Sequence, residues 1–364
     1  MKNIRYFETQ QAFEAAYNGS DYIEPWVSYV NNGSVNYNMT EDQKIAKYVN
    51  MPLTIESLGT GNVTFTNFNP NITNNTSYKK NDGEWTTVPV ENYAMVPIPV
   101  VAGDVIQFKG TNGVSSAYYS GAPVINSTAQ FKVKGNIMSL YIGDGFEEAD
   151  TITISSLYAN FFKNATNLVS AKGLILPATT LSSQCYSNMF EGCTNLVDAP
   201  KILPATTLAN YCYQYMFKNC SSLTCTPTLP ATTLASSCYN SMFYECTSLT
   251  SVSTLPATTM VSGCYSYMFY GCTSLVRAPE LPATTLYGGC YGYMFKNCSS
   301  LNYIKALMTS MIGSNSSNSD QWVSGVAANG TFVMNPNAEW YDRRDDPDVR
   351  GAYGVPVGWT IEDA

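Results

Sequence analysis

The chain contains no histidine among its 364 residues. Histidine is the commonest general base, the commonest zinc ligand and the usual partner of a catalytic serine or cysteine. Its absence excludes Ser–His, Cys–His and histidine–metal chemistry. No carboxylate pair falls in a catalytic pattern, and no phosphate-binding glycine motif or nucleophile elbow is present. The sequence therefore predicts a protein that is not an enzyme, with no catalytic residues and no cofactor.

Charged residues are scarce, at 13% of the chain, about half the share in ordinary soluble domains. The net charge is −8, and the one dense basic pair, Arg343-Arg344, lies inside the acidic segment Asp342–Asp348. Because a basic patch is missing, nucleic acid is not expected as a partner. The acidic segment could bind Ca²⁺, but its spacing fits no EF-hand loop. An ion-paired loop is favoured, and no metal site is expected.

Long apolar runs are also missing. No window approaches the roughly 18 apolar residues that a bilayer-spanning helix needs, so no membrane insertion is expected. The N-terminal segment Met1–Glu8 has neither an apolar core nor a small-residue cleavage site. A signal peptide is therefore not expected.

The most informative feature that is present is an internal repeat. The hexapeptide Leu-Pro-Ala-Thr-Thr-Leu begins at Leu176, Leu203, Leu229 and Leu281, and a Met-ending copy spans Leu255–Met260. Each copy precedes the same frame: Cys-Tyr, two variable residues, Met-Phe, two variable residues, Cys, two further residues and Leu. A partial copy upstream carries Ala165 at the last Cys position, as a terminal capping unit would. Recurrence at a spacing of 26 or 27 residues predicts a repeat array.

Each unit has two halves of different character. In the unit that begins at Cys185, apolar residues recur at i, i+4 and i+8, which predicts a short amphipathic helix. The other half carries two prolines, as at Pro279 and Pro282, and these favour an extended path. Each unit is predicted to be one coil of a right-handed α/β solenoid.

The flanks of the array have different patterns. Residues 51–150 predict a small β-sandwich, because apolar residues alternate with polar ones in several runs: Val63 and Phe65, Ile106 and Phe108, Phe131 and Val133. Residues 71–75 are expected to be one of its loops. Residues 1–50 are predicted to form an N-terminal arm or anchor. The array occupies 151–304, as one degenerate cap and five units, and 305–364 form a C-terminal cap with strands at 331–333 and 358–361.

Ten of the eleven cysteines fall in two repeat columns: Cys185, Cys212, Cys238, Cys264, Cys290 and Cys193, Cys220, Cys246, Cys272, Cys298. Two cysteines eight apart on a helix lie about 12 Å from each other, too far for a disulfide. Zinc is not expected, because close Cys-x-x-Cys pairs are absent. The columns are predicted to be free, buried core residues. Cys225 lies outside both columns and is the candidate exposed thiol.

Tyrosines also recur at fixed positions. The tyrosine that follows the first cysteine of every unit, as in Tyr186, could form a stacking ladder for sugars, but packing in the core is favoured. Variable positions are better candidates for ligand contact, because core packing does not dictate them. Tyr215, Tyr267 and Tyr293 are assigned to one such column, and Tyr211 and Tyr287 to a second. Ordinary surface tyrosine in a Tyr-rich chain is the alternative interpretation.

The units resemble the leucine-rich repeats of BspA-like surface proteins of Bacteroides and its relatives. The residues that carry the likeness are Phe190–Leu196 and Phe269–Leu275, within a match over roughly 157–304. The segments Tyr6–Thr9, Glu24–Tyr29 and Gly354–Thr360 look like the flanks of such arrays in Bacteroides bacteriophages and prophages. The unit is longer than is usual in the family.

The resemblance implies a leucine-rich-type solenoid within a multi-domain chain of mixed β and α/β class. It implies a non-enzymatic structural virion protein of a tailed bacteriophage, such as a head fibre, decoration or tail-associated fibre. The expected partners are other virion proteins, host surface or glycans, and further copies of the chain in a homo-oligomer. A virion protein would fold in the host cytoplasm without a signal peptide. The alternatives are a bacterial cell-surface adhesin that binds host proteins and, remotely, a carboxylate-only glycan hydrolase.

Overall fold

A computed structural model of the chain describes residues 6–7, 28–29, 48–66, 76–91, 94–110, 124–309, 317–338, 351 and 354–364. The loop expected at 71–75, the acidic segment 342–348 and most of the predicted N-terminal arm lie outside the described residues. The described part is mostly β, with one short α-helix and two 3₁₀ helices.

The elements follow one another as β1 (Tyr6–Phe7), β2 (Ser28–Tyr29), β3 (Leu53–Ser57), β4 (Gly61–Thr66), β5 (Thr76–Lys80), β6 (Thr86–Thr87), β7 (Val90–Glu91), β8 (Ala94–Met95), β9 (Ile98–Val100), β10 (Val105–Gly110), β11 (Val124–Ser127), β12 (Phe131–Asn136), α3 (Ser139–Ile142), η1 (Phe146–Glu148), β13 (Leu168–Ile175), β14 (Tyr303–Ala306), η2 (Ser317–Ser319), β15 (Thr331–Met334) and β16 (Thr360–Asp363).

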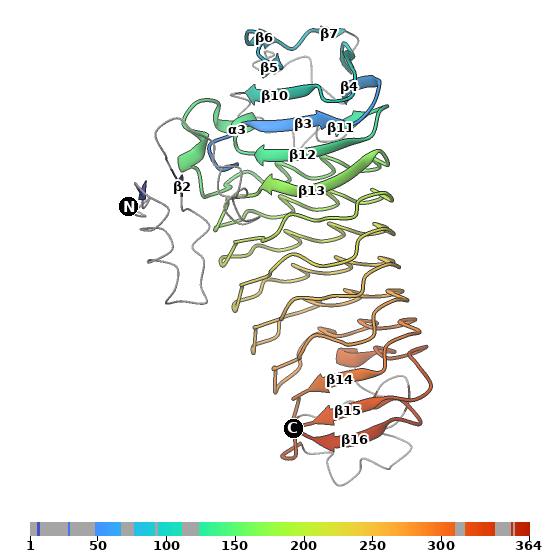
Figure 1. The fold of residues 1–364 in the computed structure, drawn as a ribbon. Helices are drawn as coiled ribbons and strands as arrows, with labels where there is room; N and C mark the ends of the chain where they lie inside the picture. The colour runs from blue at the N-terminus through green and yellow to red at the C-terminus, as the bar shows by residue number, and fades with distance from the viewer. Residues whose placement is uncertain are drawn as a thin grey trace.

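Two sheets lie at the N-terminal end of an elongated stack (Figure 1). The larger has the strand order β13-β12-β3-β10-β5-β6, and the smaller has the order β11-β4-β9. Burial alternates along β10, where Ile106 and Phe108 are fully buried, so the strand predicted from its two-residue period is confirmed. Phe65 of β4 meets Phe108 edge-on, with ring centroids 4.9 Å apart. This contact joins the two sheets.

The core continues from the sheets into the repeats. Strand β12 pairs with β3 on one side and, in parallel, with β13 on the other. Phe161 lies against Phe65 at 6.0 Å and against Phe162 at 4.9 Å, measured between ring centroids. The predicted boundary near residue 150 therefore lies within one continuous hydrophobic core.

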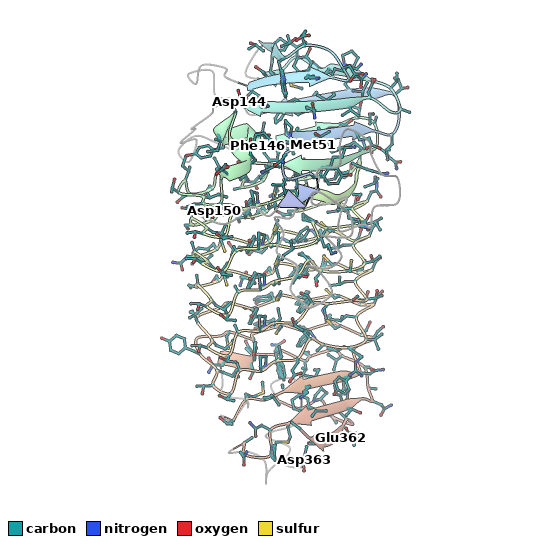
Figure 2. All side chains as sticks on the ribbon, turned by 60° about the vertical axis from the view of Figure 1, so that its left-hand side comes forward. Met51, Asp144, Phe146, Asp150, Glu362 and Asp363 are labelled. Carbon is teal, nitrogen blue, oxygen red and sulfur yellow. The ribbon has the colours of Figure 1, made fainter. Side chains whose placement is uncertain are left out.

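The repeats form coils that lie one on the next along the molecule (Figure 1). Parallel bridges join equivalent residues of successive coils, as at Thr151–Thr180–Thr207 and at Ser170–Asp198. Side chains fill the interior along the whole length of the stack (Figure 2). Each coil thus buries its apolar side against its neighbours, as repeat architectures require.

The helix predicted for the second half of each unit is wrong. Residues 183–192 form a run of overlapping turns, here named the turn ribbon, with no α-helix. Alternate N–H groups bond three residues back, as from Ser187 to the Gln184 carbonyl, while the others bond to the next coil, as from Asn188 to the Gln214 carbonyl. The α/β class expected for the array is corrected accordingly, because an α-helix keeps all its N–H bonds to itself.

A left-handed residue at every fourth position produces the turn ribbon. The three left-handed positions of each unit are a first column (Ser156, Gln184, Tyr211, Ser237, Gly263, Gly289), a middle column (Asn160, Asn188, Tyr215, Ser241, Tyr267, Tyr293) and a last column (Asn164, Gly192, Asn219, Glu245, Gly271, Asn297). A repeat of four residues keeps Cys185, Met189 and Cys193 on the same inner side. Eight residues of an α-helix would turn through about 800° and leave Cys193 about 80° away from Cys185.

The ten column cysteines are buried and carry free thiols. Those of the second column donate to the preceding coil: the Cys220 Sγ lies 3.1 Å from the Phe190 carbonyl oxygen and the Cys246 Sγ 3.1 Å from that of Phe217. The buried thiol thus gives a second hydrogen bond to a carbonyl inside the stack. Ala165 stands at this position in the first coil, where no earlier coil of the array offers a phenylalanine carbonyl.

Two aromatic columns run through the interior. Tyr186 and Tyr213 are buried and stacked with ring centroids 5.7 Å apart, and Phe190 and Phe217 are stacked at 5.2 Å. The other pairs in each column repeat this arrangement: Tyr158, Tyr239, Tyr265 and Tyr291, and Phe162, Phe243, Phe269 and Phe295. These rings fill the space between the coils.

The coils continue past the last recognisable unit. Strands β14, β15 and β16 pair in parallel, so two further turns of chain extend the stack. Trp322 is fully buried and lies 6.2 Å from Tyr291 and 6.1 Å from Phe295 between ring centroids. Its indole N–H donates to the Gly354 carbonyl at 2.9 Å. One tryptophan therefore closes both aromatic columns.

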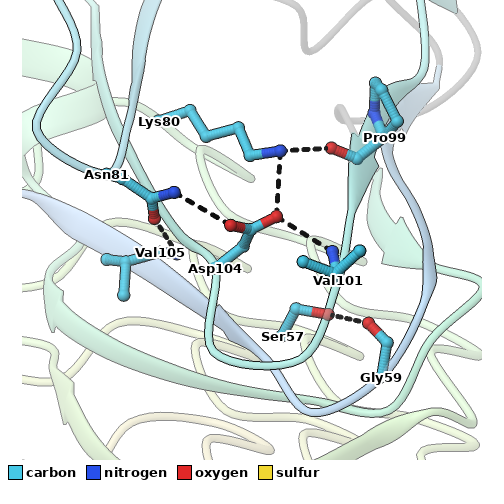
Figure 3. Close-up of polar contacts among 8 residues, drawn as sticks. All are labelled: Ser57, Gly59, Lys80, Asn81, Pro99, Val101, Asp104 and Val105. Atoms are coloured by element: carbon cyan, nitrogen blue, oxygen red, sulfur yellow. Dashed lines mark hydrogen bonds and ion pairs between the residues drawn. The ribbon is translucent and has the colours of Figure 1, made fainter.

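A charged turn joins the ends of β5 and β9 to the start of β10 (Figure 3). Asp104 accepts hydrogen bonds from Asn81 Nδ2 at 2.8 Å and from the Val101 N–H at 2.9 Å, and the Lys80 ammonium lies 2.9 Å from Oδ2. These bonds favour the ionised carboxylate and lower the pKa of Asp104 to about 2.

The thiols should differ in reactivity according to burial. Burial raises the pKa of Cys185 and Cys298 to about 12, so the reactive thiolate is rare at these sites. Cys225 is exposed. Iodoacetamide followed by peptide mass spectrometry should modify Cys225 alone in the folded chain and all eleven cysteines after unfolding. Equal labelling of a column cysteine in the folded chain would contradict the buried columns.

The Tyr186 and Tyr213 hydroxyls are buried without a partner, whereas the Tyr158 hydroxyl donates to the Ile137 carbonyl at 3.2 Å. Tyr213→Phe should therefore raise the free energy of unfolding by about 1 kcal/mol, because it removes an unsatisfied polar group. Tyr158→Phe, the matched control, should lower it. Urea titration distinguishes the two, and a loss of stability in Tyr213→Phe would show that its hydroxyl is bonded.

The Asp104 turn should weaken in acid. Because its folded pKa lies below the ordinary value of about 3.9, its contribution is present above pH 4 and is lost as the pH falls towards 2. Asp104→Asn should destabilise the chain at pH 5 and have little effect near pH 2. Thermal unfolding at the two pH values measures this, and an unchanged difference between variant and parent would contradict it.

Candidate binding face

The outer side of the turn ribbon carries residues that its backbone does not require. A left-handed conformation suits glycine and asparagine and costs other L-residues about 1 kcal/mol or more. Tyr215, Tyr267 and Tyr293 nevertheless adopt it, with φ of 57° or 58°. Backbone strain of this kind gathers at functional sites. We therefore take this face as the candidate site.

Two tyrosines of the middle column stack on each other. The rings of Tyr267 and Tyr293 are nearly parallel, with centroids 4.5 Å apart. The Tyr293 hydroxyl donates to Asp320 Oδ2 at 2.6 Å, which fixes its orientation. Both side chains are partly buried. The pair is thus held in a fixed orientation and stays partly exposed.

A second surface column follows directly after the invariant phenylalanine of each coil. Its members, here named the outer column, are Lys163, Glu191, Lys218, Tyr244, Tyr270 and Lys296. Tyr244 and Tyr270 stack with centroids 4.5 Å apart, and Asn297 Nδ2 donates to the Tyr270 hydroxyl at 3.1 Å. Sequence reasoning did not select these tyrosines, although their fixed position after the phenylalanine was a usable signal.

Lysines lie beside the stacked rings. The Lys218 ammonium is 5.1 Å from the Tyr215 ring centroid and 5.6 Å from that of Tyr244. The Lys296 ammonium is 5.2 Å from the Tyr293 centroid. These are cation–π distances. The seven residues Tyr215, Lys218, Tyr244, Tyr267, Tyr270, Tyr293 and Lys296 are named the tyrosine patch below.

Two hydroxyls of the tyrosine patch, those of Tyr244 and Tyr267, resist ionisation because their pKa values are raised. Partial burial raises the pKa of Tyr244, and the neighbouring Tyr270 adds to the shift. Partial burial likewise raises the pKa of Tyr267, with a further contribution from the Asp320 charge. These two side chains therefore offer neutral phenol groups, which both donate and accept hydrogen bonds.

Of the candidate tyrosines, Tyr215, Tyr267 and Tyr293 share the middle column. The second column proposed from the sequence is wrong, because Tyr211 and Tyr287 occupy different positions of their units. Tyr211 directly precedes Cys212 and is left-handed, whereas Tyr287 lies three residues before Cys290. Their exposed fractions are 38% and 65%, so both reach solvent outside the patch.

The opposite, strand side of the coils is chemically different. Cys225 bridges in parallel to Ser251, and Arg277 bridges in the same way to Tyr303. The Arg277 guanidinium lies 3.6 Å from the Tyr303 ring centroid. This side offers one thiol and one closed cation–π pair, and it lacks the stacked phenols of the turn ribbon.

Within the described part of the chain, no group of three or more His, Cys, Asp or Glu residues is placed to hold a metal ion. The helices in this part are also too short to cross a membrane.

Comparison with known proteins identifies the repeats. The family model described as the BspA type leucine rich repeat region matches in six copies, over residues 149–275 and 210–319. No curated protein and no solved structure matches the chain. The matched residues begin next to the first coil and include every unit that carries the tyrosine patch. The repeats of this chain are therefore a BspA-like leucine-rich repeat region.

Proposed function

We propose that this chain is a non-enzymatic adhesion protein that binds its partner through the tyrosine patch. The observation that supports the proposal is the placement of tyrosine rings at strained left-handed positions of a rigid stack. Large, partly buried aromatic rings provide much of the affinity in binding surfaces and lose little side-chain entropy on binding. Leucine-rich repeats of this family suggest the same class of role.

We further propose the setting of this activity. The stack would act as a right-handed solenoid in a head fibre, decoration or tail-associated fibre of a tailed bacteriophage, in contact with other virion proteins and with further copies of the chain. The likeness of the terminal segments to phage-borne arrays supports this setting. A bacterial cell-surface adhesin would use the same patch on the same scaffold.

Adhesion is tested by labelling the full chain and measuring its binding to intact Bacteroides cells and to mucus-coated surfaces. Changing Tyr215, Tyr267 and Tyr293 together to Asn should weaken binding at least tenfold. The fold should persist, because Asn188 occupies the same column and suits a left-handed backbone. Tyr211→Asn, outside the patch, is the matched control and should bind like the parent. Absent binding by the parent, or equal binding by the triple variant, would overturn the proposal.

The setting is tested separately by mass spectrometry of purified phage particles, in which the chain should be present in many copies. Surface labelling of intact bacteria in the absence of particles would instead support the adhesin. Detection only in the cytosol of infected cells would contradict both settings.

A further inference from the structure

The repeated hexapeptide carries two residues that neither the core nor the tyrosine patch uses. In the copy that spans 229–234, Leu229, Ala231 and Leu234 are buried. Thr232 and Thr233, which lie between them, are exposed. Both threonines are exposed in each of the last four copies: Thr206, Thr207, Thr232, Thr233, Thr258, Thr259, Thr284 and Thr285. The burial of the hexapeptide therefore explains its other apolar residues but not its threonines.

The threonines form two ranks along the stack. Parallel bridges join Thr151 to Thr180 and Thr180 to Thr207, and in the neighbouring rank the Thr206 N–H donates to the Thr179 carbonyl at 3.1 Å. Parallel segments joined in this way lie about 4.8 Å apart, so five steps give each rank a length of roughly 24 Å. The two ranks are named the threonine face below: Thr151, Thr180, Thr207, Thr233, Thr259 and Thr285, and Thr179, Thr206, Thr232, Thr258, Thr284 and Thr309.

Most hydroxyls of the threonine face have unused hydrogen-bonding capacity. The Thr179 hydroxyl donates to the Asp150 carbonyl at 3.4 Å, and the Thr309 hydroxyl donates to the Thr284 carbonyl at 2.9 Å. The hydroxyls of the eight exposed threonines bond to none of the residues that the structure describes. Because each hydroxyl can both donate and accept, the face offers evenly spaced donors, acceptors and methyl groups.

The fold alone does not require threonine at these positions. An extended backbone favours β-branched residues, and valine would serve it equally well. The position directly after the hexapeptide varies freely from unit to unit: Ser182, Ala209, Ala235, Val261 and Tyr287. The threonine pair is identical in all five units although its side chains reach solvent. A contact outside the coil accounts for this uniformity.

Charge favours contact between copies at this face. The chain has a net charge of −8, and such a charge keeps copies apart. Neither rank contains a charged residue between Thr151 and Thr309. The tyrosine patch, by contrast, would bring Lys218 and Lys296 of one copy towards the same lysines of another. Two copies can therefore approach through the threonine face without placing like charges of the two ranks together.

The spacing of the ranks also selects the partner. A partner that makes the same contact with every coil must itself repeat at the spacing of the coils. A second copy of the chain has this spacing, because its coils are joined by the same backbone bonds. A two-fold axis brings identical faces together, and threonine hydroxyls of one copy then pair with those of the other.

We infer that two copies of the chain associate side by side through their threonine faces. This contact lies outside the tyrosine patch, and it is independent of what the patch binds. A narrow strip of this length belongs to the smaller and weaker class of protein interfaces, so association depends on concentration.

Sedimentation velocity of the full chain, from micromolar to millimolar concentration, tests the inference. The mass of the parent should rise from 39.8 kDa towards twice that value. Thr232→Lys combined with Thr258→Lys places like charges on the face and should weaken association at least about a hundredfold. Thr224→Lys combined with Thr250→Lys, at exposed positions of the strand side, is the matched control and should associate like the parent.

A second measurement locates the contact. Thr232 belongs to the middle unit of the five, so it lies near the two-fold axis of a dimer formed through this face. With the exposed Cys225 changed to Ser, Thr232→Cys should give a covalent dimer with a short bis-maleimide cross-linker. Thr250→Cys in the same background should remain monomeric. Circular dichroism establishes that each variant is folded.

The outcomes are distinct from those that concern adhesion. A parent that stays monomeric throughout, or a Thr232→Lys, Thr258→Lys variant that associates as the parent does, would overturn the inference. Equal cross-linking of Thr232→Cys and Thr250→Cys would overturn it too. The triple asparagine variant of Tyr215, Tyr267 and Tyr293 should still dimerise, so a failure of the adhesion function would leave this contact unaffected.

Discussion

The structure depends on the hydrogen bonds that pass from each turn ribbon to the next. Every second N–H, such as that of Asn188, points along the stack and bonds to a carbonyl 25 to 27 residues later. The alternate N–H groups close turns within the coil. Together they satisfy the buried backbone without a helix or a wide sheet. A coil removed from its neighbours would lose half of these bonds at once.

The aromatic and sulfur columns follow from this constraint. The backbone hydrogen bonds fix the distance between successive coils. Each side chain therefore contacts the equivalent side chain of the next coil, and flat rings such as Phe190 and Phe217 stack nearly parallel. The second cysteine column adds one hydrogen bond per coil to a phenylalanine carbonyl. The repeated sequence pattern changes at both ends of the array, where the contacts between units stop. Ala165 takes the place of a column cysteine at one end, and Trp322 lies beyond the last unit at the other.

The sequence was sufficient to predict the repeat, its spacing and the strands around Phe108 and Phe131, since a period of two or of 26 is visible directly. It failed on the turn ribbon. A helix and a chain with a left-handed residue at every fourth position both place apolar residues at i, i+4 and i+8 on one side. The residues that indicated the left-handed pattern were Gly192, Gly271 and Asn219, each directly before a cysteine. The stacking partners Tyr244 and Tyr270 also required coordinates, because only the register of the coils brings them together.

The capping residues lie at the two ends of the array, apart from the repeated units. This arrangement affects how the protein can change in evolution. The packing at the two ends, around Ala165 and Trp322, does not depend on how many units lie between them. The units themselves are almost interchangeable in sequence. Duplication or deletion of whole units would alter the reach of the rod while keeping both closures. Exchange of a single residue in the middle column, as between Ser241 and Tyr267, would move or remove a contact point without redesign of the scaffold. Length and recognition are thus free to diversify independently.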